Sequence, residues 1–286
     1  MKGDTQMEFF KVNLKEVFPC IKSEKEPVLY CYINDNAQKN QLKGRYSPAM
    51  LIAPGGGYWS VSLTREGEPV AFRYLSAGFS CFVLDYGVAP EHYPVQLMEL
   101  AAAIHYIRLN SEKWHVDKDK IAVNGYSAGG HLAASLGVLW NDEIILDALN
   151  VKGEDIRPNA MVLGYPVITA DKSFSHQGSI NNVSGTTDEN SEIYKKMSLE
   201  KQVNELTPPT FLWHTANDNV VNVKNSLVFA EALAENKVRF ELHVYPFGAH
   251  GLATSDYATN AAPERHYTYP WMEESIKFLY NLWYEV

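Results

Sequence analysis

The sequence predicts an α/β fold in which helices cover both faces of a mostly parallel β-sheet. Short apolar runs alternate with helical patterns along most of the 286 residues. Most of these runs are continuously apolar, which is typical of parallel strands that are buried on both faces. No internal repeat of the length seen in solenoids or propellers is visible. The alternation therefore predicts three layers built around one sheet.

The apolar runs predict seven strands. In chain order they are Val28–Ile33, Ala49–Ala53, Phe79–Asp85, Lys120–Asn124, Ala160–Leu163, Thr210–His214 and Arg239–Tyr245. Apolar residues at helical spacing predict five helices. These lie around Glu66–Ala77, Val95–Asn110, Ala128–Trp140, Val223–Glu235 and Trp271–Trp283. We expect all of them to belong to a single domain, residues 1–286.

Two segments interrupt the alternation of strands and helices. Residues 1–26 have only a weak pattern, and we expect an amino-terminal arm that precedes the sheet. Residues 166–207 are polar and contain no clear strand, with a weak helical pattern at Ser191–Lys201. A long connection inside a compact domain is usually a lid or a pocket wall, so we expect a small lid insertion here. The alternative is a surface insertion without a role.

Composition excludes several classes of protein. Lys and Arg number 25 against 34 Asp and Glu, for a net charge of −9, and no basic cluster is present. Binding to nucleic acid or to an anionic membrane is therefore not expected. The first residues lack the apolar segment of a signal peptide, and no apolar run is long enough to span a bilayer. Three cysteines, Cys20, Cys31 and Cys81, match no zinc spacing, which favours a cytoplasmic location.

The clearest motif is Gly-Tyr-Ser-Ala-Gly at residues 125–129. It follows an apolar run and opens a helical pattern, and a strand–turn–helix of this kind is typical of a nucleophile elbow. The residues two positions from the serine must be small, because their side chains would otherwise collide. A phosphate-binding turn is the alternative, but neither G-x-x-x-x-G-K-[ST] nor G-x-G-x-x-G is present. The pattern predicts Ser127 as a nucleophile.

A serine nucleophile needs a base, and the base needs an acid that orients it. Asp218 comes directly after the predicted strand 210–214, and His250 follows the predicted strand 239–245. Both therefore lie at the carboxyl ends of strands, where open α/β sheets place their sites. A cap or turn role is the usual alternative for a single such residue. The order Ser, Asp, His predicts a catalytic triad instead.

Acyl transfer also needs hydrogen-bond donors for an oxyanion. Three glycines at 55–57 follow the predicted strand 49–53, and they allow backbone N–H groups to approach a substrate. We expect the oxyanion hole to consist of Gly56, Gly57 and Ala128. The aromatic side chains of Tyr58, Trp59 and Tyr126 flank this region and are candidates for substrate contact, although a core position is an equal alternative.

Metal catalysis is the competing chemistry. None of the nine histidines falls in an H-E-x-x-H or H-x-H pattern. We therefore expect no catalytic metal and no cofactor. His131 and His214 lie close in sequence to the predicted catalytic elements, and we expect them to support those elements or to lie in the core.

These motifs together resemble a known group of enzymes. The motifs occur in family order as Pro-Gly-Gly-Gly-Tyr at 54–58, Arg-Glu-Gly-Glu-Pro at 65–69, Leu-Asp-Tyr at 84–86, Val-Ala-Pro at 88–90, the serine motif through Leu132, and the Asp218 and His250 loops. Over roughly residues 45–255 the chain resembles α/β-hydrolases of the acetyl xylan esterase and carbohydrate acetylesterase type. It is also similar to the hormone-sensitive-lipase-like carboxylesterases.

The resemblance implies a serine hydrolase of short-chain carboxylic esters, especially acetyl groups on sugars or oligosaccharides. It implies a small-molecule ester substrate, no cofactor, and the triad and oxyanion residues already named; a homodimer remains open. Pro54 replaces the His that precedes the glycines in the lipase-like group, and Gly87 replaces an Arg. Both departures favour the xylan-esterase-like branch. The alternatives are a peptidase of the prolyl-oligopeptidase kind, a formamidase, and a non-catalytic ligand-binding relative.

Overall fold

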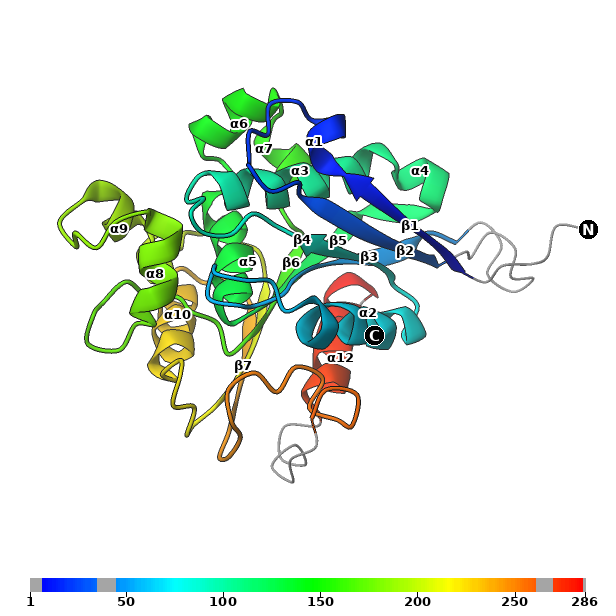
Figure 1. Cartoon of the computed structure of the whole chain (residues 1–286). Helices are drawn as coiled ribbons and strands as arrows, with labels where there is room; N and C mark the ends of the chain where they lie inside the picture. Colours follow the sequence, from blue (N-terminus) through cyan, green and yellow to red (C-terminus); the bar gives the residue numbers. More distant parts are fainter. Residues whose placement is uncertain (1–6, 35–44, 261–269, 285–286) are drawn as a thin grey trace, which may run out of the picture.

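A β-sheet of eight strands lies at the centre of the molecule, in the order β1-β2-β4-β3-β5-β6-β7-β8 (Figure 1). The computed structural model describes residues 7–34, 45–260 and 270–284. The strands are Met7–Asn13 (β1), Val28–Asn34 (β2), Ser47–Ala53 (β3), Ser80–Asp85 (β4), Val116–Tyr126 (β5), Ala160–Gly164 (β6), Thr210–Thr215 (β7) and Phe240–Tyr245 (β8). Only β2 runs against its neighbours, and every pairing from β4 to β8 is parallel.

The central strands are buried on both faces. Every residue of β3, β6 and β7 is buried, as their continuous apolar runs predict. All seven predicted strands are present within a few residues of their expected bounds. The prediction of a mostly parallel sheet between helices is therefore confirmed.

The amino-terminal arm contains a strand that the sequence did not reveal. Residues 7–13 form β1, which pairs antiparallel with β2 from Met7 opposite Asn34 to Asn13 opposite Val28. None of its residues is fully buried, so it lacks the apolar run by which the central strands are recognised. The expectation of an arm outside the sheet is wrong for these residues. Hydrogen bonding to β2 makes them the edge of the sheet.

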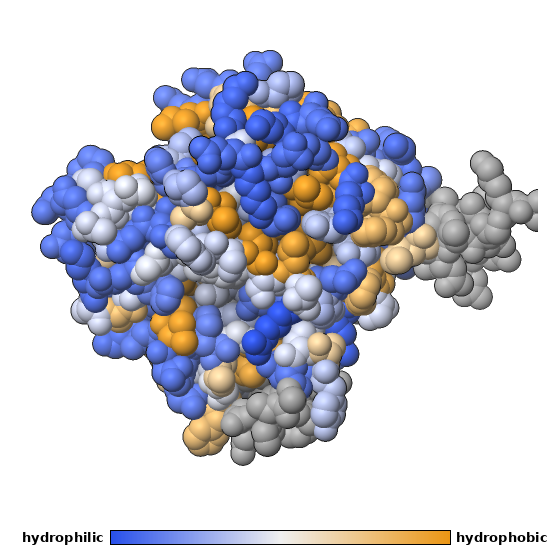
Figure 2. Space-filling view, in the orientation of Figure 1, coloured by the Kyte–Doolittle hydropathy of each residue, from blue (hydrophilic) through white to orange (hydrophobic). Residues whose placement is uncertain are grey.

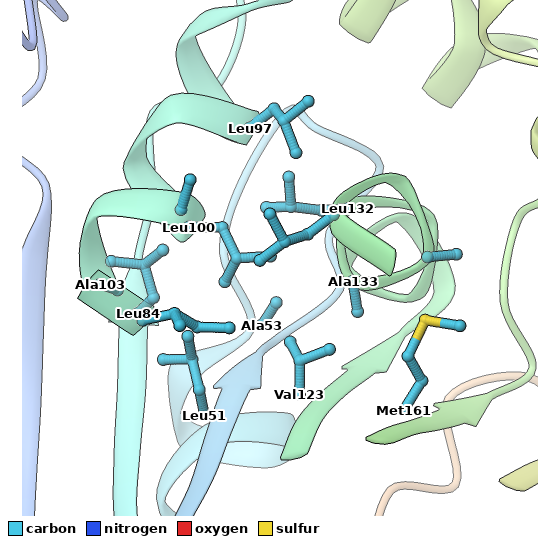
Figure 3. Close-up of a cluster of buried hydrophobic side chains, with 14 of the residues drawn as sticks. Leu51, Ala53, Leu84, Leu97, Leu100, Ala103, Val123, Leu132, Ala133 and Met161 are labelled. Atoms are coloured by element: carbon cyan, nitrogen blue, oxygen red, sulfur yellow. The ribbon is translucent and has the colours of Figure 1, made fainter. Parts of the chain in front are cut away.

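Two layers of helices cover the sheet. The larger helices on one face are α3 (Val95–Leu109), α5 (Ser127–Leu139) and α10 (Lys224–Glu235), and those on the other are α2 (Glu68–Ser76) and α12 (Trp271–Tyr284). All thirteen residues of α5 are buried, as expected for a helix that is apolar on every side. Figure 3 shows side chains of α3 and α5 packed over β3, β4 and β5. The serine motif therefore begins a helix that lies inside the molecule.

Shorter elements join these layers. They are α1 (Leu14–Val17), the π-helical turn η1 (Leu63–Gly67), α4 (Ser111–Trp114), α6 (Glu143–Leu149), α7 (Gly153–Ile156), α8 (Gln177–Ser184), α9 (Glu192–Lys196) and the 3₁₀ turn η2 (Leu199–Lys201). The last three belong to the segment 166–207, in which all residues are described and no strand occurs. The Asn225 side chain of α10 accepts the N–H groups of Ile168 and Thr169, which anchors the start of this segment.

Two further features of the described ranges concern membrane spans and cysteines. No helix there is long and apolar enough to cross a bilayer. Cys20, Cys31 and Cys81 all carry free thiols.

The close packing of α5 on β6 leads to a stability prediction. Alanine normally favours a helix over glycine by about 1 kcal/mol. At Gly137, however, an added Cβ would lie 2.1 Å from the sulfur of Met161. We expect Gly137→Ala to lower the free energy of unfolding by about 1–3 kcal/mol through overpacking, measured by urea denaturation.

The matched control for this prediction is the double variant with Met161→Ala. Removing the Met161 side chain makes room for the new methyl group, so the double variant should lose less stability than the sum of the single changes. A Gly137→Ala protein more stable than the original would contradict the packing argument.

Candidate active site

Ser127 lies in a strained turn between β5 and α5. Its φ of +52° is in the left-handed region, which a residue with a side chain adopts only under strong constraint. An added Cβ at Gly125 would lie 2.2 Å from the carbonyl oxygen of Gly129, and one at Gly129 would lie 2.1 Å from that of Ala53. Both glycines are therefore required for α5 to approach the sheet this closely.

His250 connects Ser127 to Asp218. The Nε2 atom of His250 lies 3.0 Å from the hydroxyl oxygen of Ser127, and its Nδ1 atom lies 2.7 Å from Asp218 Oδ2. A carboxylate only accepts, so Nδ1–H donates to Asp218 and leaves Nε2 free to accept the serine proton. Asp218 follows β7 and His250 follows β8, while Ser127 follows β5. The parallel strands thus bring the three side chains together at one edge of the sheet.

The carboxylate of Asp218 is held firmly in its ionised form. Its Oδ1 atom accepts the N–H groups of Val220 and Val221, each at 2.9 Å. Burial by itself raises the pKa of Asp218, but hydrogen bonds from His214 and His250 outweigh burial and hold that pKa well below its usual range. Asp218 can therefore orient His250 and stabilise its positive charge.

The two other histidines near these elements lie in the core, as expected. His214 is completely buried, with Nε2–H donating to the Val221 carbonyl at 2.9 Å and lying 3.3 Å from Asp218 Oδ2. The pKa of His131 is lowered to about 4 by burial. Its Nδ1 atom accepts the hydroxyl of Tyr58 at 2.9 Å. The His214 ring thus lies in contact with the Asp218 carboxylate, and His131 fixes the hydroxyl of Tyr58.

The glycine loop after β3 presents backbone donors next to Ser127. Gly56 and Gly57 have φ values of +134° and +67°, which glycine adopts without strain. The N–H of Gly55 already donates to Glu66 Oε2 at 2.8 Å. Among the described residues, the N–H groups of Gly56, Gly57 and Ala128 have no acceptor within the chain. These are the groups for which the sequence predicts an oxyanion-binding role.

The three aromatic candidates lie in different environments. Tyr58 and Tyr126 are fully buried, and Tyr126 packs against Tyr165 and Trp271 on the far side of the sheet from α5. They are core residues, because a side chain with no accessible surface has none to offer a substrate. The Trp59 side chain is 73% exposed, so Trp59 alone of the three can contact a ligand from its present position.

Helix α8 of the insertion forms a polar wall beside the glycine loop. The Asn182 amide donates to the Gly57 carbonyl at 2.9 Å, and an added Cβ at Gly57 would lie 3.9 Å from the hydroxyl oxygen of Ser179. At the start of the helix, His176 Nδ1 accepts the N–H of Ser179. Sequence reasoning missed these three side chains; the polar composition of 166–207 was their only signal.

The protonation of His176 follows from this capping contact. Because Nδ1 accepts a backbone N–H, the neutral ring carries its proton on Nε2. Burial, together with the positive charge of a protonated His250, lowers the pKa of His176, so the neutral ring is favoured. Within the part of the chain that the structure describes, Nε2–H makes no hydrogen bond to protein, and it remains able to donate to a ligand.

The next question is whether side chains that commonly bind metal ions are grouped in the described residues. In residues 7–34, 45–260 and 270–284, no three side chains of His, Cys, Asp or Glu are grouped as metal ligands would be. The polar groups that the described site does bring together are Ser127, His250, Asp218 and the backbone N–H groups of the glycine loop and Ala128.

The chain is similar to curated proteins named as a xylanase and as an acetylxylan esterase. Endo-1,4-beta-xylanase B of Butyrivibrio fibrisolvens is 36% identical over 237 residues, which cover 80% of this chain and 35% of that protein. Acetylxylan esterase of Xylanibacter ruminicola is 26% identical over 231 residues, covering 78% of this chain and 43% of the relative. The chain therefore spans less than half the length of either relative.

A solved structure and a family model agree with these relatives. The acetyl ester-xyloside bifunctional hydrolase from Caldicellulosiruptor lactoaceticus superposes with a TM-score of 0.81 and 34% identity, covering 96% of both chains. The family model described as BD-FAE matches residues 35–233, which is more than half of the chain. These matches confirm the resemblance drawn from the motifs. The chain belongs to the BD-FAE family and has an α/β-hydrolase fold.

Proposed function

We infer that this chain hydrolyses carboxylic esters through an acyl-enzyme formed on Ser127. The observation that carries the inference is the continuous hydrogen-bonded path from the Ser127 hydroxyl through His250 to Asp218. Relatives named as an acetylxylan esterase and an acetyl ester-xyloside hydrolase support the same chemistry. A peptidase or formamidase of the same fold would use this path as well, so the substrate panel below includes amides.

The geometry suggests how the reaction proceeds. Ser127 Oγ attacks the ester carbonyl while His250 Nε2 takes its proton, and Asp218 stabilises the resulting imidazolium. The N–H groups of Gly56, Gly57 and Ala128 stabilise the negative charge on the carbonyl oxygen. The tetrahedral intermediate then collapses, and His250 returns the proton to the departing alcohol. A water molecule, deprotonated by His250 in turn, attacks the acyl-enzyme and releases the acid and the free serine.

The polar wall favours a hydroxyl-rich alcohol on the substrate. The Ser179 hydroxyl lies beside the glycine loop and donates to His176 Nδ1 at 2.8 Å, so its oxygen can accept from a sugar hydroxyl, while His176 Nε2–H can donate to one. Figure 2 shows mainly hydrophilic and intermediate residues over α8 and α9, at the left of the view. An interfacial lipase lid needs an amphipathic face instead. We therefore assign acetyl groups on sugars or oligosaccharides as the substrate class.

The role of Ser127 is tested by Ser127→Ala. We expect acetate release from acetylated xylo-oligosaccharides and from 4-nitrophenyl acetate to fall by about 10⁴–10⁶-fold with the fold intact, because one triad residue carries effects of that size. The panel also contains an aryl formamide and a prolyl anilide, on which the original protein should be much slower. Ser135→Ala, a buried serine of the same helix, serves as the control and should remain active. Activity of Ser127→Ala above a tenth of the original would contradict the assignment.

The role of His176 is tested by comparing two substrates. Removing one hydrogen bond to a substrate hydroxyl costs about 0.5–1.5 kcal/mol, so His176→Ala should lower kcat/KM on acetylated xylo-oligosaccharides by up to about tenfold. The same change should leave 4-nitrophenyl acetate within about twofold, because its leaving group has no hydroxyl to bind. Gln177→Ala, on the neighbouring residue of α8, is the control. An equal loss on both substrates would show that His176 does not contact the alcohol.

Acyl length is tested with aryl esters from two to twelve carbons, kept below their micelle concentrations. Each added methylene gains at most about 0.8 kcal/mol while it fits, and overpacking then costs about 1–3 kcal/mol. We expect kcat/KM to peak between acetyl and butyryl and to fall at least about tenfold by octanoyl. Values still rising at eight carbons would refute the short-acyl assignment and favour a lipase-like pocket.

A further inference from the structure

A buried carboxylate that the reaction does not use lies behind the proposed active site. Glu66, in η1, is 4% exposed. Its Oε2 atom accepts the Gly55 N–H at 2.8 Å, and its Oε1 atom accepts the Tyr165 hydroxyl at 2.7 Å. No salt bridge reaches it from any residue of the described ranges. Burying a carboxylate without an ion-pair partner lowers the free energy of unfolding. A functional role is the natural explanation for keeping such a group.

The hydrogen-bond pattern selects the ionised form of this carboxylate. The hydroxyl oxygen of Tyr165 accepts the Ala253 N–H at 2.9 Å, so its own hydrogen is directed to Glu66. A protonated Glu66 would place a hydrogen against a donor, whereas the carboxylate accepts from both sides. Burial holds the pKa of Glu66 above its ordinary value, although the bonds from Tyr165 and Gly55, together with a protonated His250, limit that rise.

The Glu66 carboxylate lies next to both the glycine loop and the loop that carries His250. An added Cβ at Gly55 would lie 2.7 Å from Glu66 Oε2 and 3.0 Å from the Ser127 Cβ, so the carboxylate lies directly behind the glycine loop. An added Cβ at Gly251, the residue after His250, would lie 3.9 Å from Oε1. The Tyr165 ring meets the His250 imidazole edge to face, with ring centroids 4.9 Å apart.

We propose that Glu66 is a positioning residue that ties the glycine loop at residues 55–57 to the loop that carries His250 and Ala253. Through the Gly55 N–H it sets the direction of the donors that follow at Gly56 and Gly57. Through Tyr165 it holds the histidine loop at Ala253. This inference rests on the proposed ester hydrolysis, because its effects are read in that reaction.

Several other charged or titratable groups face the same region. Asp218, Tyr165 and His176 face His250, and His214 lies behind Asp218. Burial raises the pKa values of Tyr86 and Tyr126, and the nearby Glu66 charge adds to that rise. The Arg65 guanidinium donates to Asn260 at 2.7 Å rather than to Glu66. Loss of the Glu66 charge therefore leaves Asp218 as the carboxylate that stabilises the imidazolium.

The test separates geometry from charge with two variants. In Glu66→Gln the amide NH₂ must face one of the two donors, and the charge is lost. We expect kcat to fall about 10–100-fold, less than the ~10²–10³ of a deleted oxyanion donor, with KM within about threefold. Glu66→Asp keeps the charge but is one methylene too short to reach both donors, so its kcat should fall as well, again with KM within about threefold.

The controls distinguish this role from general destabilisation. Glu200→Gln neutralises a half-buried carboxylate, which accepts the Thr169 hydroxyl at 3.0 Å, and it should keep both kcat and KM. Tyr165→Phe should also lower kcat, and its effect should be less than additive with Glu66→Gln. This variant provides the test if Glu66→Gln fails to fold.

Two results would overturn the inference, and a third concerns the proposed function alone. Folded Glu66→Gln with the original kcat would refute the role of Glu66. Tyr165→Phe with the original kcat would refute the link between the loops. If the original protein neither hydrolyses 4-nitrophenyl acetate nor reacts at Ser127 with a fluorophosphonate, ester hydrolysis itself is wrong. That outcome is visible before any Glu66 variant is compared.

Discussion

The architecture of the site depends on the approach of α5 to the sheet at Gly125 and Gly129. At both positions a single methyl group would lie little more than 2 Å from a backbone oxygen. This contact forces Ser127 into the left-handed region and directs the amino-terminal end of a wholly buried helix at the site. The helix dipole and its unpaired N–H groups then favour negative charge where an oxyanion would form.

Charge in the site is arranged around one histidine. Asp218 is fixed by two backbone N–H groups, so the imidazole that bonds to it has a defined tautomer and direction. Glu66 lies on the other side, held by a backbone N–H and a tyrosine hydroxyl. In a region shielded from water, fixed dipoles of this kind stabilise a developing charge without having to reorganise.

The insertion 166–207 adds a polar surface to this scaffold. Its helix α8 bonds to the glycine loop through Asn182, and His176 at its start offers a donor near His250. The hydrogen-bonded path from Ser127 through His250 to Asp218 and the polar wall of α8 thus come from different parts of the chain. A family with one catalytic arrangement can accept different alcohols by changing such a segment, because the segment contacts the site without building it.

The sequence by itself determined the seven strands β2 to β8, the five larger helices, the serine turn, and the loops of Asp218 and His250, because each depends on local periodicity or on a motif within a few residues. Only the tertiary structure decided that residues 7–13 join the sheet, since an exposed edge strand has no apolar run. Glu66 and Tyr165 are 99 positions apart, and their role follows from a contact that no local pattern encodes. Tyr126, next to the serine in sequence, points to the opposite face of the sheet because side chains alternate along a strand.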